Sequence, residues 1–248
     1  MEKITSRRNP LCVHMKNLGA SRSYREERRE FLCDGLKLLE EAVTAGADIT
    51  NVLASSHLPF PLPVDTSVYF TDSGVINSIS TLKNARDTLF TVKMPPSGGF
   101  DSCDGTYVLL DGVQDPGNVG TVVRTAFAFG VKGVILTGSC ADLYNPKTIR
   151  ATMGAIFRQK VFSMSSEELA KLRSGGMRFV GAVPGGPGSA VDVIIKNTVI
   201  AVGSEGKGLS EEILELCDES ISIPISPDCD SLNAAVAAAI LMWEAADH

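Results

Sequence analysis

Residues 106–137 read TYVLLDGVQDPGNVGTVVRTAFAFGVKGVILT, and this stretch decides the fold. The apolar run 106–111 predicts a buried strand, and a turn rich in Pro and Gly separates it from a predicted helix over 119–129. Gly130 ends that helix, and a second buried strand is predicted over 133–137. Buried strands joined by a helix are typical of parallel sheets, because a parallel connection needs a crossover of that length. The stretch therefore predicts an α/β domain.

The same alternation of strands and helices continues to the end of the chain. The further predicted strands are 160–164, 177–183, 197–203 and 220–225. The further predicted helices are 145–158, 165–173, 209–217 and 232–246. This pattern predicts a parallel sheet covered on both faces, with ligands bound in the loops beyond the carboxyl ends of the strands.

A smaller α/β module is predicted upstream, over residues 1–95. Leu32, Leu36, Leu39 and Val43 recur at helical spacing and predict one helix over 24–45. Its other predicted elements are strands over 48–55, 67–71 and 88–94 and a short helix over 73–82. The linker 95–105, PPSGGFDSCDG, separates this module from a second domain over 106–248.

Composition is that of an ordinary globular protein. Of 248 residues, 44% are hydrophobic and 21% charged. The longest apolar run, 232–243, is shorter than the ~20 residues that cross a bilayer, and the N-terminus has no apolar signal region, so no membrane association is expected. Six cysteines stand singly and three histidines lie far apart, so no metal site and no redox pair are expected. The thiols are expected to be reduced in a cytoplasmic protein.

Charge is distributed unevenly along the chain. The net charge is −6, but residues 1–30 carry eight basic and four acidic residues. A basic arm on an acidic body favours contact with a polyanion at one end. The least compensated cations, Arg7, Arg8 and Arg22, are the candidates for contacts with the phosphates of a nucleic acid. The alternative is a solvated helix face, because the segment YREERREF mixes both signs at helical pairing distances.

Several common functions have no motif here. No GxGxxG follows a predicted strand, which argues against a dinucleotide-binding domain. The stretch AVGSEGKGLS, residues 201–210, lacks the first Gly and the final Ser or Thr of a phosphate-binding loop. No GxSxG elbow is present, so a serine hydrolase is also disfavoured.

Three segments carry polar residues in places that favour chemistry. In the first, 111–130, Asn118 can cap the following helix, and Arg124 lies amid apolar residues and needs an anion or a salt bridge. In the second, 200–209, Glu205 stands on a glycine-rich loop at the end of a strand, where a carboxylate is either functional or simply solvated.

The third segment, 221–244, leads from a strand through a polar loop into an alanine-rich helix. Ser231 can cap that helix, and Asn233 is a lone polar residue that needs hydrogen-bond partners. The helix is apolar on nearly all faces, so it is either a core helix or half of a subunit interface.

Together, in this order and at this spacing, the three segments resemble the three sequence motifs of the SpoU (TrmH) family of RNA ribose 2′-O-methyltransferases. The resemblance covers about 106–246. Residues 1–95, with ITSRRNP and FLCDGLKLLEEAV, resemble the ribosomal-protein-L30e-like substrate-binding domain that precedes the catalytic domain in many members that act on ribosomal RNA.

The resemblance implies a C-terminal parallel-sheet methyltransferase domain with a deep trefoil knot, S-adenosyl-L-methionine as methyl donor, and a homodimer. By position, the family's catalytic residues fall on Asn118, Arg124, Glu205, Ser231 and Asn233. Its cofactor contacts fall on Gly203, Ile223, Leu232 and, more weakly, Ala182. The loop SPDCD, 226–230, departs from the glycine-containing loop of many relatives.

The expected activity is methylation of ribosomal RNA. The alternatives are a tRNA 2′-O-methyltransferase and an RNA-binding or assembly protein that keeps the fold without catalysis. Because a guanidinium rarely gives up its proton, Arg124 is expected to bind the target phosphate and stabilise the developing alkoxide rather than act as general base.

Overall fold

The computed structural model describes residues 2–80, 87–96, 100, 104–189 and 198–246. The chain forms two compact units, one of residues 1–96 with 142–157 and one of residues 97–141 with 158–248. Residues 142–157 therefore pack with the first unit, although the sequence prediction has them inside the second domain. Within the described ranges, no helix is both long and apolar enough to cross a membrane.

The first unit is built on a mixed five-stranded sheet. Its strands, in spatial order, are β1 (Glu2–Lys3), β4 (Ser67–Phe70), β3 (Ile49–Ala54), β5 (Thr88–Lys93) and β2 (Glu30–Asp34). The pairs β1–β4 and β3–β4 are parallel, whereas β3–β5 and β2–β5 are antiparallel. β5 is thus the centre of an antiparallel half of the sheet.

Helices cover both faces of this sheet. They are α1 (Pro10–Ala20), α2 (Arg22–Arg28), α3 (Leu36–Thr44), α4 (Ser73–Ile79), α6 (Pro146–Thr152) and the 3-10 turn η1 (Ala155–Phe157). Alternate residues of β2 face opposite ways: Leu32 packs with α1 and α4, whereas Phe31 and Cys33 pack with α3 and α6. Each face of the sheet therefore has its own apolar core.

The single helix predicted over 24–45 is wrong. The structure has α2, then strand β2, then α3. Arg29 ends α2 in the left-handed region at φ 50°, and Gly35, at φ 110°, turns the chain out of β2. Five residues of β2 pair with β5, so burial between two helical layers overrides the local helical spacing.

The segment 142–157 completes the core of the first unit. Ile149 is 1% exposed, and the ring of Phe31 lies 4.7 Å from that of Tyr144 and 6.4 Å from that of Phe157, centroid to centroid. The buried guanidinium of Arg25 donates to the Asp142 carboxylate and to the carbonyl oxygen of Leu18. An apolar cluster and a buried ion pair thus join this segment to the N-terminal residues.

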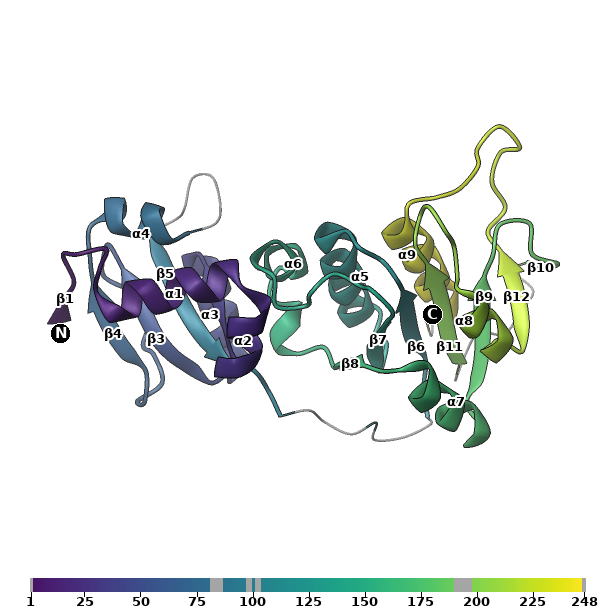
Figure 1. The fold of residues 1–248 in the computed structure, drawn as a ribbon, viewed down its shortest axis with the longest axis horizontal. Helices are drawn as coiled ribbons and strands as arrows, with labels where there is room; N and C mark the ends of the chain where they lie inside the picture. The colour runs from purple at the N-terminus through teal and green to yellow at the C-terminus, as the bar shows by residue number, and fades with distance from the viewer. Residues whose placement is uncertain (1, 81–86, 97–99, 101–103, 190–197, 247–248) are drawn as a thin grey trace. The chain divides into compact units, whose positions relative to one another are not determined.

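The second unit has a seven-stranded sheet in which every pair is parallel (Figure 1). Its strands, in spatial order, are β10 (Gly188–Ser189), β12 (Glu219–Ser222), β9 (Arg178–Ala182), β11 (Thr198–Gly203), β6 (Tyr107–Asp111), β7 (Gly133–Thr137) and β8 (Val161–Ser163). The predicted parallel sheet is confirmed.

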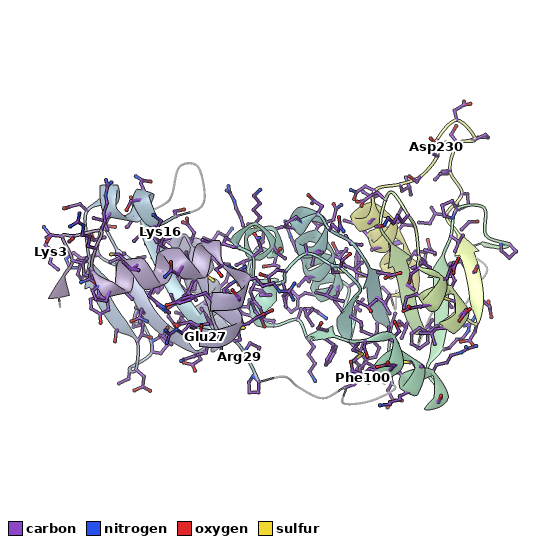
Figure 2. The ribbon with its side chains drawn as sticks, in the orientation of Figure 1. Lys3, Lys16, Glu27, Arg29, Phe100 and Asp230 are labelled. Atoms are coloured by element: carbon purple, nitrogen blue, oxygen red, sulfur yellow. The ribbon has the colours of Figure 1, made fainter. Side chains whose placement is uncertain are left out.

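Four helices cover this sheet: α5 (Pro116–Ala128), α7 (Ser166–Ser174), α8 (Glu211–Leu216) and α9 (Ala234–Ala245). Leu169 of α7 and Ile213 of α8 pack with Leu109 and Phe179 on one face. α5 contacts β7, α9 contacts β11, and the two helices contact each other. Beyond the carboxyl ends of the strands, a long loop joins β12 to α9 (Figure 1). Figure 2 labels Asp230 on this loop, well away from the strands.

Candidate active site

Three polar side chains from distant parts of the sequence meet at the carboxyl edge of the second unit's sheet. Asn118 lies in the first turn of α5, Glu205 on the loop after β11, and Asn233 directly before α9. Asn118 Nδ2 donates to Glu205 Oε1, and Asn233 Nδ2 lies 3.1 Å from Asn118 Oδ1 and 3.3 Å from Glu205 Oε1. We call Asn118, Glu205 and Asn233 the polar cluster.

Asp115, rather than Asn118, caps α5. Its carboxylate accepts a hydrogen bond of 2.9 Å from the backbone N–H of Asn118, and Pro116 takes the first helical position. The prediction that Asn118 caps the helix is therefore wrong. Because Asp115 performs this function, the amide of Asn118 is free to reach Glu205.

Close packing of backbone fixes the loop that carries Glu205. Ser204 and Gly208 exchange two backbone hydrogen bonds, of 3.2 and 2.8 Å, directly after β11. A Cβ on Gly203 would lie 2.0 Å from the carbonyl carbon of Gly208, so no other residue fits there without a shift of the backbone. Glu205 is thereby held on a tight turn at the end of the strand.

Asn233 both caps α9 and contacts the other two residues of the polar cluster. Its Oδ1 accepts from the N–H groups of Ala235, at 3.0 Å, and Val236, at 3.3 Å, which makes it the cap of α9. Its Nδ2 remains for the polar cluster. The prediction that Ser231 caps this helix is wrong, since the capping residue, Asn233, lies two residues later.

Glu205 Oε1 is the centre of the polar cluster. It accepts from Asn118 and Asn233, and the backbone N–H of Ala234 lies 3.4 Å away. The first N–H group of α9 thus faces the carboxylate, as the helix dipole favours. Glu205 Oε2 accepts no hydrogen bond from the part of the chain that the structure describes, and the residue is exposed.

A pocket of about 140 Å³ adjoins the polar cluster. All four residues predicted to contact the cofactor line it: Ala182, Gly203, Ile223 and Leu232. Further apolar walls come from Val183, Pro184, Ile221, Ile225, Ala234 and Ala237. Glu205 and Ser231 also line it, so a carboxylate stands at one side of an otherwise mostly apolar space.

Several of these wall residues were not predicted from the sequence. Val183 and Pro184 follow β9 directly, and Ile225 lies beyond the end of β12. The signal that could have identified them is position, because ligands of parallel sheets bind beyond the carboxyl ends of the strands.

Arg124 is not part of the polar cluster within one chain. It is exposed on α5, six residues after Asn118 and so about 9 Å further along the helix axis. None of the described residues forms a hydrogen bond or ion pair with it. An exposed, unpaired guanidinium of this kind is available for an anion from outside the chain.

The three arginines predicted to bind RNA differ in their surroundings. Arg7 and Arg8 are exposed, and Arg7 donates to the carbonyl oxygen of Gly74 at 3.4 Å. Arg22 pairs with Glu26 at 2.8 Å, one helical turn away, and this hydrogen bond raises the pKa of the guanidinium. The expectation that Arg22 is among the least compensated cations is therefore wrong.

Together, the fold and the site define an α/β protein whose parallel sheet carries a ligand pocket beside a carboxylate fixed by two amides. Across the described ranges, no three His, Cys, Asp or Glu residues are grouped so as to hold a metal ion. An apolar pocket with one carboxylate suits a ligand that is mostly apolar and carries a positive charge.

Comparison with known proteins identifies the family. The model of the SpoU rRNA methylase family matches residues 105–243, more than half of the chain. The 23S rRNA (adenosine(1067)-2′-O)-methyltransferase of Streptomyces laurentii is 31% identical, over 98% of this chain and 94% of that protein. The 23S rRNA (guanosine(2553)-2′-O)-methyltransferase RlmP of Bacillus subtilis is 28% identical, over 98% of both chains.

Solved structures of related proteins support the same family. The AdoMet-bound rRNA methyltransferase of Sinorhizobium meliloti is 28% identical and superposes with a TM-score of 0.86, over 98% of this chain and 97% of that one. The SpoU methyltransferase AviRb of Streptomyces viridochromogenes, in complex with AdoMet, gives a TM-score of 0.85 at 27% identity, over 96% and 97%. This chain belongs to the SpoU rRNA methylase family.

Proposed function

We propose that this chain transfers a methyl group from S-adenosylmethionine to a ribose 2′-hydroxyl of ribosomal RNA. The observation that carries the proposal is the polar cluster of Asn118, Glu205 and Asn233 at the side of an apolar pocket. Relatives that align over 98% of the chain are named as enzymes that methylate 23S rRNA at the 2′-oxygen. A cytoplasmic location follows from such a substrate.

The residues of the pocket fit the proposed donor. The apolar side chains of Ile223, Ile225 and Leu232 suit a flat adenine ring, and Glu205 suits a positively charged sulfonium. Gly203 and Ala182 line the pocket at the ends of their strands, and we propose that main-chain groups there hydrogen-bond the polar edges of the donor. When bound, S-adenosylmethionine supplies a methyl carbon that an oxygen nucleophile can attack.

The polar cluster holds its own geometry before substrate arrives. Asn118 and Asn233 fix the carboxylate of Glu205 through Oε1, which leaves Oε2 for a hydrogen bond from the substrate hydroxyl. Preorganisation of this kind lowers the barrier, because alignment of reacting groups contributes up to about 7–11 kcal/mol. Ser231 lines the pocket and is proposed to help order the same site.

Arg124 is proposed to bind the target phosphate and stabilise negative charge that develops on the 2′-oxygen. Its exposure and lack of a partner among the described residues support this role. Arg124→Lys keeps the charge but not the planar fork of donors, so we expect turnover to fall and RNA affinity to weaken. Nearly full turnover with unchanged RNA affinity would contradict the role of the guanidinium.

We include a homodimer in the proposal, formed through α5 and α9. Large apolar side chains are exposed on these helices: Phe127 at 47%, Val236 at 48% and Trp243 at 51%. The same face of α5 carries Arg124. Trp243→Glu places a charge on this face and should give a monomer by light scattering, whereas Leu214→Glu, on exposed α8, should not.

The N-terminal unit is proposed to be the L30e-like, RNA-binding part of the chain. Exposed Arg7 and Arg8 support this, and replacing both with Glu should weaken RNA binding while binding of the donor is retained.

A trefoil knot in the second unit belongs to the same proposal. Its support is the path of the chain, which runs from β12, paired with β9, back to α9 against β11 and α5.

The decisive experiment incubates the purified protein with labelled donor and either ribosomal RNA or tRNA, and then digests the RNA to nucleosides. The proposal expects labelled 2′-O-methylnucleosides from ribosomal RNA. Label in tRNA alone favours a tRNA methyltransferase, and no label in any RNA favours a binding or assembly protein. Glu205→Gln should reduce turnover strongly while the fold is retained.

A further inference from the structure

The loops that follow β6 and β7 are joined to each other by backbone hydrogen bonds. Gly112 N donates to Thr137 O at 3.2 Å, and Ala141 N donates to Val113 O at 2.9 Å. Gly112 and Gly138 both adopt positive φ, 64° and 60°, so the two loops turn in the same way. We call residues 112–114 and 138–141 the β6–β7 shelf.

The shelf is anchored by one buried side chain, Asp111, and one half-buried side chain, Cys140. The carboxylate of Asp111, 7% exposed, accepts from Ser210 N at 2.7 Å and so ties the shelf to the loop that carries Glu205. The Cys140 sulfur lies 3.2 Å from Leu110 O and 3.1 Å from Thr137 O. Burial raises the pKa of this thiol, so it is protonated and can donate to these carbonyls.

Two exposed polar side chains stand on the shelf. Gln114 Nε2 lies 3.2 Å from Ser139 Oγ, and both residues are exposed. Among the described residues, no second group hydrogen-bonds the carboxamide of Gln114. Its carbonyl oxygen and one N–H are therefore open to solvent, while Ser139 limits the orientations that the side chain can adopt.

The order of the strands shows on which side of the polar cluster the shelf lies. The pocket is lined from β9, β11 and β12, and the polar cluster lies where β11 and β6 adjoin. The shelf belongs to β6 and β7, on the other side of the cluster from the pocket. In-line transfer of a methyl group requires the acceptor to approach from the side opposite the donor, which is the side of the shelf.

We propose that Gln114, oriented by Ser139, binds the base of the nucleotide whose ribose is methylated. This inference rests on the proposed function. A carboxamide offers a donor and an acceptor side by side, and so matches a base edge that presents an acceptor and a donor. Enzymes that act on single-stranded RNA commonly read such edges of unstacked bases. Gln114 is thus a specificity-determining residue, and Ser139 is a positioning residue.

The variants separate binding of a base from a purely structural role. Gln114→Ala removes both hydrogen-bonding groups. Gln114→Glu keeps the contact within the shelf, because the Ser139 hydroxyl can donate to a carboxylate, but it removes the donor that faces the base. Ser139→Ala frees the carboxamide. Ser174→Ala, an exposed serine on α7 that donates to Ala170 O, is the matched control.

The test first maps the methylated nucleotide with the wild-type protein, and then uses RNA fragments that carry each of the four bases at that position. With saturating donor, wild type should prefer the native base by about 5- to 150-fold in kcat/KM, the discrimination that one bidentate contact provides. Gln114→Ala and Gln114→Glu should bring this ratio close to one, and Ser139→Ala should lower it. Donor affinity should stay within about twofold in all of them.

The outcomes are distinct. Retention of the wild-type base ratio by Gln114→Ala or Gln114→Glu overturns the inference while the proposed function stands. A wild-type protein that methylates no RNA removes the proposed function and this subsite together. An equal loss of base preference in Ser174→Ala would mean that the assay reports general damage, and would also count against the subsite.

Discussion

At the scale of single residues, Gly203 is the position where the site tolerates no side chain. Gly203→Ala would put a methyl group 2.0 Å from the backbone of Gly208, and the loop that carries Glu205 would have to move. We expect the unfolding free energy to fall by about 3 kcal/mol. Calorimetric titration should also show loss of donor binding.

Gly206, in the same loop, is the matched control. A Cβ there meets nothing within 4 Å, and its φ is not in the left-handed region. Gly206→Ala should therefore change the unfolding free energy by no more than about 0.5 kcal/mol. If both alanine variants behaved alike, close packing at Gly203 would not be what fixes this loop.

Asn233 allows helix capping to be separated from the chemistry of the site. Asn233→Ala removes the cap of α9 and should lower the unfolding free energy by about 1 kcal/mol. Asn233→Asp keeps the cap, since Asp and Asn cap equally well, but places a second carboxylate beside Glu205. Both variants should lose turnover. The alanine variant should lose stability in urea at every pH, whereas repulsion between the two carboxylates should lower the stability of the aspartate variant at pH 7 and fade as acid protonates one of them. An active Asn233→Asp enzyme would contradict the role of the amide.

At the scale of elements, the sequence predicts the second unit far better than the first. Each strand from β6 to β12 except the two-residue β10 falls within or beside its predicted range, because runs such as 133–137 are buried on both faces and bounded by turns. In the first unit, Leu32, Leu36, Leu39 and Val43 have helical spacing, yet they belong to two elements. Pairing of β2 with β5 is a long-range contact that local spacing cannot encode.

Some residues of the site could likewise be predicted from the sequence, and others could not. Asn118, Glu205 and Asn233 could be predicted from three motifs, and the structure brings them into hydrogen-bond contact. The capping residues of α5 and α9 could not be predicted, because Asp115 and Asn233 have nearby residues of equal capping preference. The pairing of Gln114 with Ser139 depends on the register of two parallel strands, and no local pattern records it.

Strand β2 carries a buried carboxylate whose ionisation should make stability depend on pH. Burial opposes ionisation of Glu30, but hydrogen bonds from Thr50, Thr91 and His14 outweigh it and lower its pKa below 4.5. A lowered pKa stabilises the fold at higher pH, and this contribution is lost as pH falls through the folded pKa. Urea midpoints of wild type and Glu30→Gln should therefore differ at pH 7 and converge below about pH 4. A constant difference would contradict this.

At the scale of the whole molecule, the first unit is discontinuous in sequence. Residues 142–157 leave the second unit after β7, pack on the first unit and return before β8. A cut at the linker after residue 96 would therefore divide one apolar core between two fragments. Deletion of residues 1–96 would likewise leave Tyr144, Ile149 and Phe157 without the residues that bury them.

This arrangement predicts that residues 1–96 alone do not fold stably. Fusing 142–157 to them through about 15 Gly and Ser residues, with a reach of about 20 Å, should restore cooperative unfolding in a calorimetric scan. The same fusion with Ile149→Ala should lose about 2–5 kcal/mol, because Ile149 is 1% exposed among Phe31, Leu39 and Phe90. Equal stability of the bare fragment and the fusion would show that the segment 142–157 is not needed to close this core.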